Sequence, residues 1–199
     1  MRFCACLVCL LMTVASHALE QPEYEVIDKF AGIEIRAYQA YIVAQFEVEG
    51  AFDEAGNVAF EPLGDYIFGA NQRDEKIGMT APVEQRSGGS AHRLTFVMPS
   101  RYDLSTLPQP KDERIVFKII DAREVAALRY SGNWSEARYR KHEKELYARL
   151  AESAYQPCGE PVWARFNPPF WPGFMRRNEI HVAVNCPNPS QTGTPGEIE

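Results

Sequence analysis

Hydrophobic and polar residues alternate along much of the chain, the pattern of strands that bury one face. Short segments of this kind, bounded by glycine, proline or polar residues, predict extended structure. They span residues 24–27, 33–38, 41–48, 76–83, 92–98, 114–120, 125–130, 161–166 and 179–185. The pattern predicts a domain rich in antiparallel strands.

Two segments follow a helical period instead. Between Phe52 and Phe68, apolar residues recur at steps of three and four, which predicts an amphipathic helix bent at Pro62. A second helix is predicted over residues 134–154, because Asn133-Trp134-Ser135-Glu136 has the form of a capping box. Each helix must bury one face against the sheet, so the fold class is α+β.

The segment that leads into each helix is repeated. Val43-Ala44, Gly50 and Phe52-Asp53-Glu54-Ala55 match Val125-Ala126, Gly132 and Trp134-Ser135-Glu136-Ala137 without a gap, at an offset of 82 residues. Both copies run from strand through glycine to helix and then to further strands. The repeat predicts two β-α-β-β halves related by an approximate two-fold axis.

The two ends of the chain differ from the middle. Residues 1–18 combine a basic start, an apolar run and small residues at Ser16 and Ala18, which is typical of a secretory signal peptide cut before Leu19. The run is shorter than the ~20 residues that span a bilayer. Residues 187–199 form a polar tail rich in proline and glycine, which we expect to be disordered. These bounds leave one domain over residues 19–186, in an exported, periplasmic or secreted protein.

Composition narrows the class of function. The chain is 45% hydrophobic and 24% charged, as in ordinary globular proteins. The formal net charge of −6, or −7 after loss of Arg2 with the signal, argues against nucleic acid, because phosphate contacts require a basic face. No later segment is apolar enough to cross a membrane.

Cysteine placement predicts one disulfide. Cys4, Cys6 and Cys9 fall inside the signal, which leaves Cys158 and Cys186 for an oxidising compartment. A hairpin folded about Pro172 would place these two cysteines directly opposite each other. The alternative is a pair of unrelated buried thiols.

Signatures of catalysis are scarce. The chain contains no G-x-S-x-G, no P-loop and no G-x-G-x-x-G. His92, His142 and His181 are widely spaced, which is not the spacing of a metal site, and each is more often a structural residue than an iron ligand. We therefore expect a binding protein rather than an enzyme.

Residues 163–177 are unusual in joining five aromatic residues and several prolines to three arginines. Such a segment suits a flat apolar ligand with carboxylates at its edge, because guanidinium groups pair with carboxylates in bidentate fashion. The alternative is that the rings cap the sheet and the arginines pair with Glu160 or Glu179.

Several segments taken together resemble the SOUL/heme-binding protein family. The most specific are Lys76-Ile77-Gly78-Met79-Thr80-Ala81-Pro82-Val83 and Arg176-Arg177-Asn178-Glu179-Ile180. The shorter ones are Tyr24-Glu25-Val26-Ile27, Glu34-Ile35-Arg36-Ala37-Tyr38, Tyr66-Ile67-Phe68-Gly69-Ala70-Asn71 and Phe96-Val97-Met98-Pro99. They occur in order over about residues 22–185.

The resemblance implies a distorted antiparallel β-barrel of eight or nine strands, flanked by two helices. It also implies non-covalent binding of a heme or porphyrin in an apolar groove beside the first helix. On this chain the apolar contacts would be Leu63, Ile67, Met79, Phe170 and Phe174, and the partners of the propionates would be Lys76, Arg176 and Arg177.

One departure from the family matters. Some members are thought to ligate iron through a histidine just before the tyrosine of the Glu34–Tyr38 segment, and here that position is Ala37. Binding would therefore rest on apolar contact and propionate pairing, without that axial ligand.

Two other classes of function stay open at this stage. The chain could be a ligand-free interaction module of the cell envelope, with its groove filled by its own side chains. It could also be a small-molecule hydrolase on a similar two-repeat fold, with Glu84 or Glu179 as the key group in a cleft.

Overall fold

The computed structural model describes residues 19–88 and 91–186. Within them the chain forms nine strands, two α-helices and one 3₁₀ turn. The elements are β1 (Tyr24–Phe30), β2 (Ile33–Tyr38), β3 (Tyr41–Glu49), α1 (Phe52–Phe68), β4 (Val83–Gly88), β5 (Ala91–Val97), β6 (Val116–Ile120), β7 (Arg123–Tyr130), α2 (Glu136–Leu150), β8 (Pro157–Arg165), η1 (Gly173–Met175) and β9 (Asn178–Val184). The predicted signal peptide and tail lie outside the described residues.

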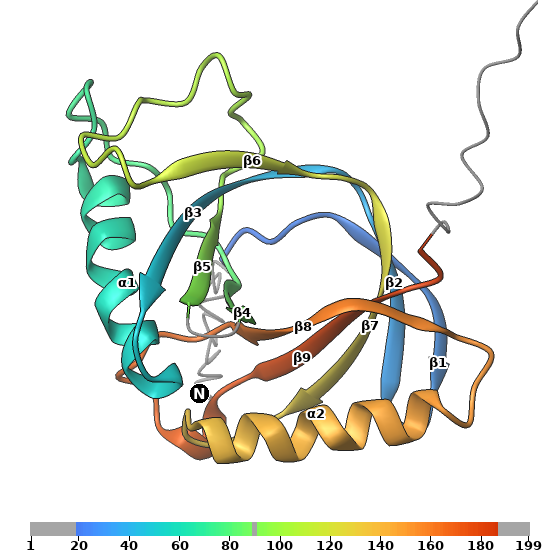
Figure 1. The fold of residues 1–199 in the computed structure, drawn as a ribbon. Helices are drawn as coiled ribbons and strands as arrows, with labels where there is room; N and C mark the ends of the chain where they lie inside the picture. Colours follow the sequence, from blue (N-terminus) through green and yellow to red (C-terminus); the bar gives the residue numbers. More distant parts are fainter. Residues whose placement is uncertain (1–18, 89–90, 187–199) are drawn as a thin grey trace, which may run out of the picture.

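All nine strands belong to one antiparallel sheet, in the order β1-β2-β7-β9-β8-β4-β5-β3-β6. Figure 1 shows this sheet curving strongly, with α1 and α2 on its outer side. Among the described residues no hydrogen-bonded pairing joins β1 to β6, so the sheet keeps two edges. The α+β class is as predicted, but the predicted barrel is not closed.

The two halves of the strand order mirror each other across the pairing of β8 with β4. One half runs β7-β9-β8 and the other β3-β5-β4, and β8 pairs with β4 where the halves meet. β3 leads into α1 through Gly50, and β7 leads into α2 through Gly132; each glycine has φ of 129°. Glycine is required at both places, because L side chains rarely adopt this backbone conformation.

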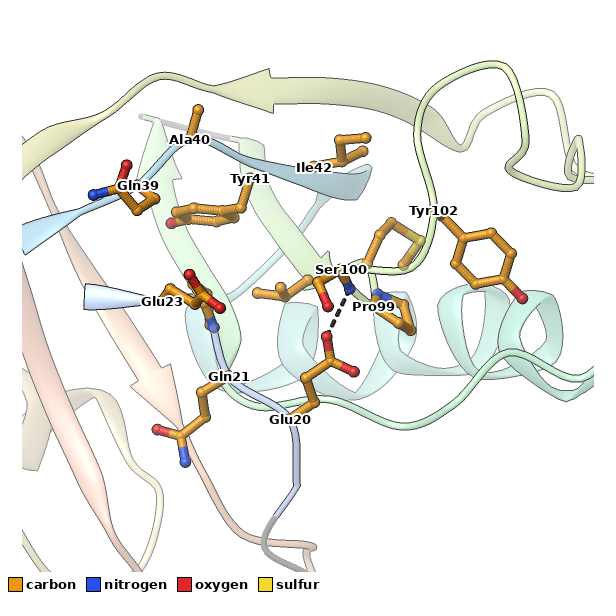
Figure 2. Close-up of a pocket in the computed structure, with 13 residues that line it drawn as sticks. Glu20, Gln21, Glu23, Gln39, Ala40, Tyr41, Ile42, Pro99, Ser100 and Tyr102 are labelled. Carbon is orange, nitrogen blue, oxygen red and sulfur yellow. Dashed lines mark hydrogen bonds between the residues drawn. The ribbon is translucent and has the colours of Figure 1, made fainter.

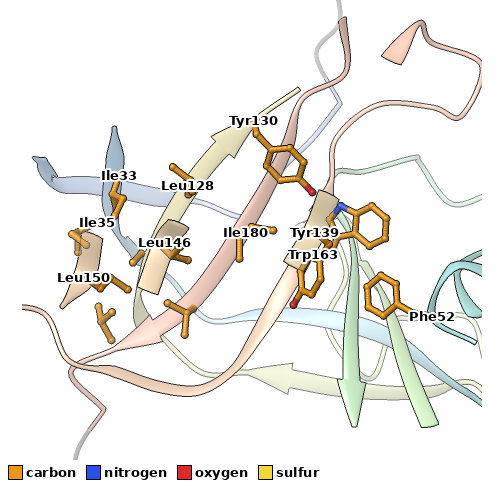
Figure 3. Close-up of a cluster of buried hydrophobic side chains, with 13 residues drawn as sticks. Ile33, Ile35, Phe52, Leu128, Tyr130, Tyr139, Leu146, Leu150, Trp163 and Ile180 are labelled. Atoms are coloured by element: carbon orange, nitrogen blue, oxygen red, sulfur yellow. The ribbon is translucent and has the colours of Figure 1, made fainter. Parts of the chain in front are cut away.

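Each helix covers its own part of the sheet. α1 packs on β3 and β5, and α2 packs on β7, β8 and β9. Under α2 the buried residues include Ile35, Leu146, Trp163 and Ile180, part of the cluster drawn in Figure 3. Because side chains alternate along a strand, Arg36 and Glu179 point to the opposite, inner face of the sheet.

The predicted limits of one extended segment and of the second helix differ from the structure. Residues 76–82, predicted as extended, precede β4 and belong to no strand, and their β-pairing is limited to an isolated bridge from Thr80 to Glu20. The predicted cap of the second helix was also wrong. Ser135, not Asn133, caps α2 and accepts a hydrogen bond from the backbone of Arg138, while the indole of Trp134 bonds Asn178 (2.8 Å) outside the helix.

The final hairpin carries the predicted disulfide in a different register. Cys158 lies opposite Ala183, because an irregularity between Cys158 and Val162 shifts the pairing of β8 with β9. Cys186 lies just beyond the end of β9, and its Cα is 6.0 Å from that of Cys158 in the disulfide. The pairing of the two cysteines is therefore as predicted, whereas the directly opposed register is wrong.

No helix among residues 19–88 and 91–186 is long and apolar enough to cross a membrane.

Candidate ligand-binding surface

Most of the large apolar side chains that remain exposed fall in three segments of the described chain. They are Val58, Phe60 and Phe68 on α1, Met79 after α1, and Phe170, Trp171, Phe174 and Met175 in the segment between β8 and β9. We call residues 167–177 the aromatic loop. Phe170 and Phe174 are 81% and 80% exposed, which is unusual for phenylalanine and marks the loop as a contact surface.

Hydrogen bonds hold the aromatic loop in shape. The backbone of Gly132 donates to the carbonyl of Gly173 (2.9 Å), which ties the loop to the segment before α2. Arg176 donates to the carbonyls of Trp171 and Pro169 within the loop, and its guanidinium lies over the ring of Trp134 at 4.4 Å. The exposed rings therefore sit on a fixed backbone.

The outer face of α1 offers a second apolar strip. Phe60, Gly64 and Phe68 follow one another at four-residue steps and so share one side of the helix. Nothing lies within 4 Å of a Cβ built on Gly64, so there is open space between the two phenylalanines. The backbone of Ile77 donates to the carbonyl of Ile67 (2.8 Å), which brings residues 76–79 beside the end of this helix.

Three of the predicted apolar contacts and one predicted cation are accessible. Met79, Phe170 and Phe174 are exposed, and so is Lys76. Arg176 is half-buried by its bonds to the loop.

Leu63 and Ile67 are each 3% exposed and pack in the core beneath α1. The stripe that predicts the helix is the stripe that packs on the sheet, so these two side chains are not open to a ligand in this structure. The exposed strip of Phe60 and Phe68 was missed. Its signal was their four-residue spacing on the side of the helix away from the sheet.

Arg177 is committed to a buried charge network on the inner face of the sheet. Its guanidinium pairs with Glu179 (2.8 Å), which is fully buried and also bonds Arg36 (2.6 Å) and His181 (2.7 Å). Burial alone would raise the pKa of Glu179, but hydrogen bonds and charges from His181 and Arg36 hold it well below its usual range. The expected role of Arg177 as a propionate partner would therefore require breaking an internal ion pair.

The hydrolase hypothesis named Glu84 or Glu179 as the key group, and Glu179 does not have the raised pKa that it required. Glu179 is ionised and paired, which is the opposite of a raised pKa in an apolar cleft. Glu84 is buried and accepts a hydrogen bond from the hydroxyl of Thr95 (3.3 Å).

Each described histidine is hydrogen-bonded through one ring nitrogen, and the Nδ1 of His92 is buried without a partner among the described residues. His92 and His181 are buried and bonded to the carbonyl of Gly50 (3.0 Å) and to Glu179, and His142 bonds Glu145 (2.9 Å) while its ring stacks on Tyr130. No group of three or more metal-ligating side chains occurs in the described part of the chain. These residues do not offer an open axial ligand to iron.

A cleft of about 380 Å³ opens elsewhere, between the N-terminal segment and the start of β3. Figure 2 shows Glu20, Glu23 and Tyr41 around it, with Glu20 accepting a hydrogen bond from the backbone of Ser100 (2.6 Å). Its lining contains two carboxylates and no lysine, arginine or histidine. An anionic ligand would meet like charge there, so we place the candidate site on the aromatic loop and α1 instead.

Comparison with known families identifies the class of protein. The model of the family described as SOUL heme-binding protein matches residues 19–183. The chain belongs to this family.

Named relatives agree with the family. The chain is 28% identical over 160 residues to "Heme-binding protein 1" of Xenopus tropicalis, a match that covers 76% of this chain and 83% of the relative. It is also 28% identical to "Heme-binding protein 1" of Mus musculus, over 64% of this chain and 70% of the relative.

Solved structures share the fold at low sequence identity. The C-terminal domain of EcmrR has a TM-score of 0.60 at 12% identity and covers 81% of this chain and 98% of that domain. A hydrolase encoded by lin2189 from Listeria innocua has a TM-score of 0.52 at 11% identity, over 77% of this chain and 91% of that one. At these identities the likeness concerns the fold alone.

Proposed function

We propose that this protein binds a heme or porphyrin non-covalently on the surface formed by the aromatic loop, residues 76–79 and the outer face of α1. The observation that carries the proposal is the exposure of Phe170 and Phe174 on a loop whose backbone is fixed by hydrogen bonds. Membership in the SOUL heme-binding protein family supports the same ligand class.

Binding would be favoured by the apolar area that the ligand covers and by the rigid backbone of the aromatic loop. Covering apolar surface contributes roughly 25 cal/mol per Å², and a rigid loop loses little conformational entropy when a flat ring settles on it. Lys76 and Arg176 stand near this surface as candidate partners for the ligand carboxylates. Leu63 and Ile67 would support α1 from beneath rather than touch the ring.

Iron coordination is not part of the proposal. Ala37 replaces the histidine expected in some family members, and the three described histidines are committed to other partners. The porphyrin ring and its carboxylates, rather than the metal, would supply the binding free energy.

We infer that the protein acts outside the cytoplasm, in a periplasm or as a secreted protein. The pattern of residues 1–18 and the disulfide between Cys158 and Cys186 support export, because disulfides persist in oxidising compartments. We also infer that the two halves of the sheet, each with its helix, are repeats of one β-α-β-β unit. The matched glycines and the strand order support this inference.

A pair of double variants tests the location of the site. Phe170→Ser with Phe174→Ser should weaken hemin and protoporphyrin IX binding by about tenfold or more, because each ring loses on the order of 1 kcal/mol of apolar contact. The matched control, Val116→Ser with Ile119→Ser, removes exposed apolar side chains from the edge strand β6 and should leave affinity unchanged. Absorbance and tryptophan-quenching titrations measure both.

Equal affinity in wild type and the aromatic-loop variant would place the ligand elsewhere. A wild-type protein that binds neither tetrapyrrole would favour the alternative, in which the exposed rings serve a protein contact in the cell envelope.

A further inference from the structure

Arg165, at the end of β8, is a buried cation without a carboxylate partner. It is 9% exposed, and only its Nη2 donates to an acceptor among the described residues, the Oε1 of Gln85 (2.6 Å). Its Nε is buried with no hydrogen-bond partner in that part of the chain. The pKa of Arg165 is lowered to about 10, mainly by burial and also by the charge of Arg176, while Tyr130 and Asp53 act the other way.

The surroundings of Arg165 are rich in cations. Its guanidinium lies over Trp134 at 4.8 Å, and Arg176 lies over the same ring at 4.4 Å. Arg138 also lies close by, since its charge acts on buried Tyr130 together with that of Arg165. Arg165 and half-buried Arg176 form no salt bridge with a described carboxylate, whereas most other buried or half-buried arginines do; Arg138, which forms none either, is exposed. Asp53, the acid whose charge acts on Arg165, accepts a hydrogen bond from the backbone of Glu136 instead (2.7 Å).

Two other polar groups are buried at this place. The Tyr130 hydroxyl and the Trp163 indole nitrogen are buried without a well-formed hydrogen bond, and Arg165 stacks on Trp163 at 4.1 Å. Figure 3 shows the Tyr130 oxygen and the Trp163 nitrogen turned toward each other. Because the Trp163 indole acts on Tyr130 as a hydrogen-bond donor, the polar atom at this place without a partner in the described chain is the Nε of Arg165. Native proteins leave few such groups unpaired.

We propose that Arg165, beside Arg176 on the ring of Trp134, forms a carboxylate-binding position, and that one carboxylate of the tetrapyrrole occupies it. The position adjoins the aromatic loop, because Arg165 precedes that loop by two residues and Arg176 lies within it. This inference rests on the proposed function and replaces Arg177, which is already paired with Glu179, as the main guanidinium for the ligand.

An isolated buried charge is costly, and an incoming carboxylate would relieve that cost with a charge-assisted, bidentate hydrogen bond. The N-termini of α1 and α2 meet beside this position, linked by the bond from Glu136 to Asp53, and both helix ends favour an anion. The stacking of the guanidiniums on Trp134 and Trp163 holds the donors in place until the anion binds.

The test compares two ligands and three substitutions in the purified protein. The ligands are protoporphyrin IX and its dimethyl ester, which keeps the ring but blocks both carboxylates. The substitutions are Arg165→Met, Arg165→Lys and the control Arg93→Met, which removes an exposed charge on β5 that pairs with Glu47. A separate arm measures the melting temperature with and without sodium acetate at constant ionic strength.

We expect Arg165→Met to weaken protoporphyrin IX binding by about tenfold, to leave the dimethyl ester unaffected, and to melt no lower than wild type. Arg165→Lys keeps the positive charge but lacks the paired N–H donors of a guanidinium. It should therefore weaken protoporphyrin IX binding by a smaller factor. The control should bind as wild type does. Acetate should raise the melting temperature of wild type and not that of Arg165→Met.

Unchanged protoporphyrin IX binding in Arg165→Lys and in any folded Arg165→Met would overturn the proposal, and a large fall in melting temperature would assign Arg165 a structural role. If wild type binds neither porphyrin, the proposed function fails, and the acetate arm alone decides between a site for free carboxylates and no anion site.

Discussion

At the scale of single residues, charge pairing separates those that hold the fold from those that are free to bind. Glu179 is surrounded by Arg36, Arg177 and His181 and has no exposed surface. Arg165 is buried nearly as deeply and has no such partner. The short motif Arg176-Arg177-Asn178-Glu179 contains residues with different partners, since Arg176 bonds carbonyls of the aromatic loop while Arg177 pairs with Glu179. The sequence alone could not assign these partners, because they depend on how the loop folds before β9.

The Glu179 network makes a first prediction. Glu179→Gln should lower the free energy of unfolding by about 3–5 kcal/mol, because it removes the buried counter-charge shared by Arg36 and Arg177 and leaves Arg36 with only the partly exposed Glu34. The control Glu47→Gln, which loses an exposed pair with Arg93, should change it by less than about 1 kcal/mol. Urea denaturation at neutral pH measures both, and equal effects would contradict the account.

The same carboxylate sets a pH dependence. Its pKa in the folded protein lies below that of an unfolded glutamate, about 4.3, so the unfolded chain takes up the proton first. Its contribution is therefore complete above that value and is lost as the pH falls through the folded pKa. Denaturation curves from pH 6 downward should lose stability more steeply in wild type than in Glu179→Gln, and parallel curves would refute the assignment.

At the scale of elements, most segments were correctly predicted to be strands or helices. The details of strand register and helix capping were predicted less well. α1 has the predicted bounds, and the hairpin of β8 and β9 brings Cys158 to Cys186 as expected. The register of that hairpin and the cap of α2 were wrong. Both depend on local contacts, an irregularity in β8 and the bond from Trp134 to Asn178, which alternation does not encode.

The disulfide makes a prediction about the last hairpin. It joins residues 28 apart in sequence, so Cys158→Ser with Cys186→Ser should lower the free energy of unfolding by roughly 2–4 kcal/mol. A reducing agent should destabilise wild type similarly and should not affect the double variant. Wild type that unfolds at the same urea concentration with and without reductant would contradict this prediction.

The two glycines before the helices make a further prediction. Gly50→Ala and Gly132→Ala should each cost about 1–3 kcal/mol, because both glycines have φ of 129°. A Cβ on Gly132 would also approach the Arg138 guanidinium at 2.8 Å, but that flexible group can move aside. Gly64→Ala, in α1 with open space around it, should instead stabilise by up to about 1 kcal/mol. A melting temperature for Gly64→Ala below those of Gly50→Ala and Gly132→Ala would contradict this prediction.

At the scale of the whole molecule, the sequence was enough for the α+β class, the two helices and the family, but not for the open sheet or the full ligand surface. Pairing between distant strands decides whether a sheet closes, and no local pattern reports it. Leu63 and Ile67 were predicted to face the ligand, yet the folded sheet buries them, and Phe60 and Phe68 take the exposed side of α1. The aromatic loop was found from sequence because its composition is unusual.

The central claim is that the ring and its carboxylates, not iron, hold the ligand. Parallel titrations of the purified protein with hemin and with protoporphyrin IX test it most directly. The account predicts dissociation constants within about threefold of each other, a difference below 1 kcal/mol. Metal-free porphyrin that binds more than about tenfold more weakly than hemin would show that an iron ligand supplies at least ~1.4 kcal/mol, and would contradict the account.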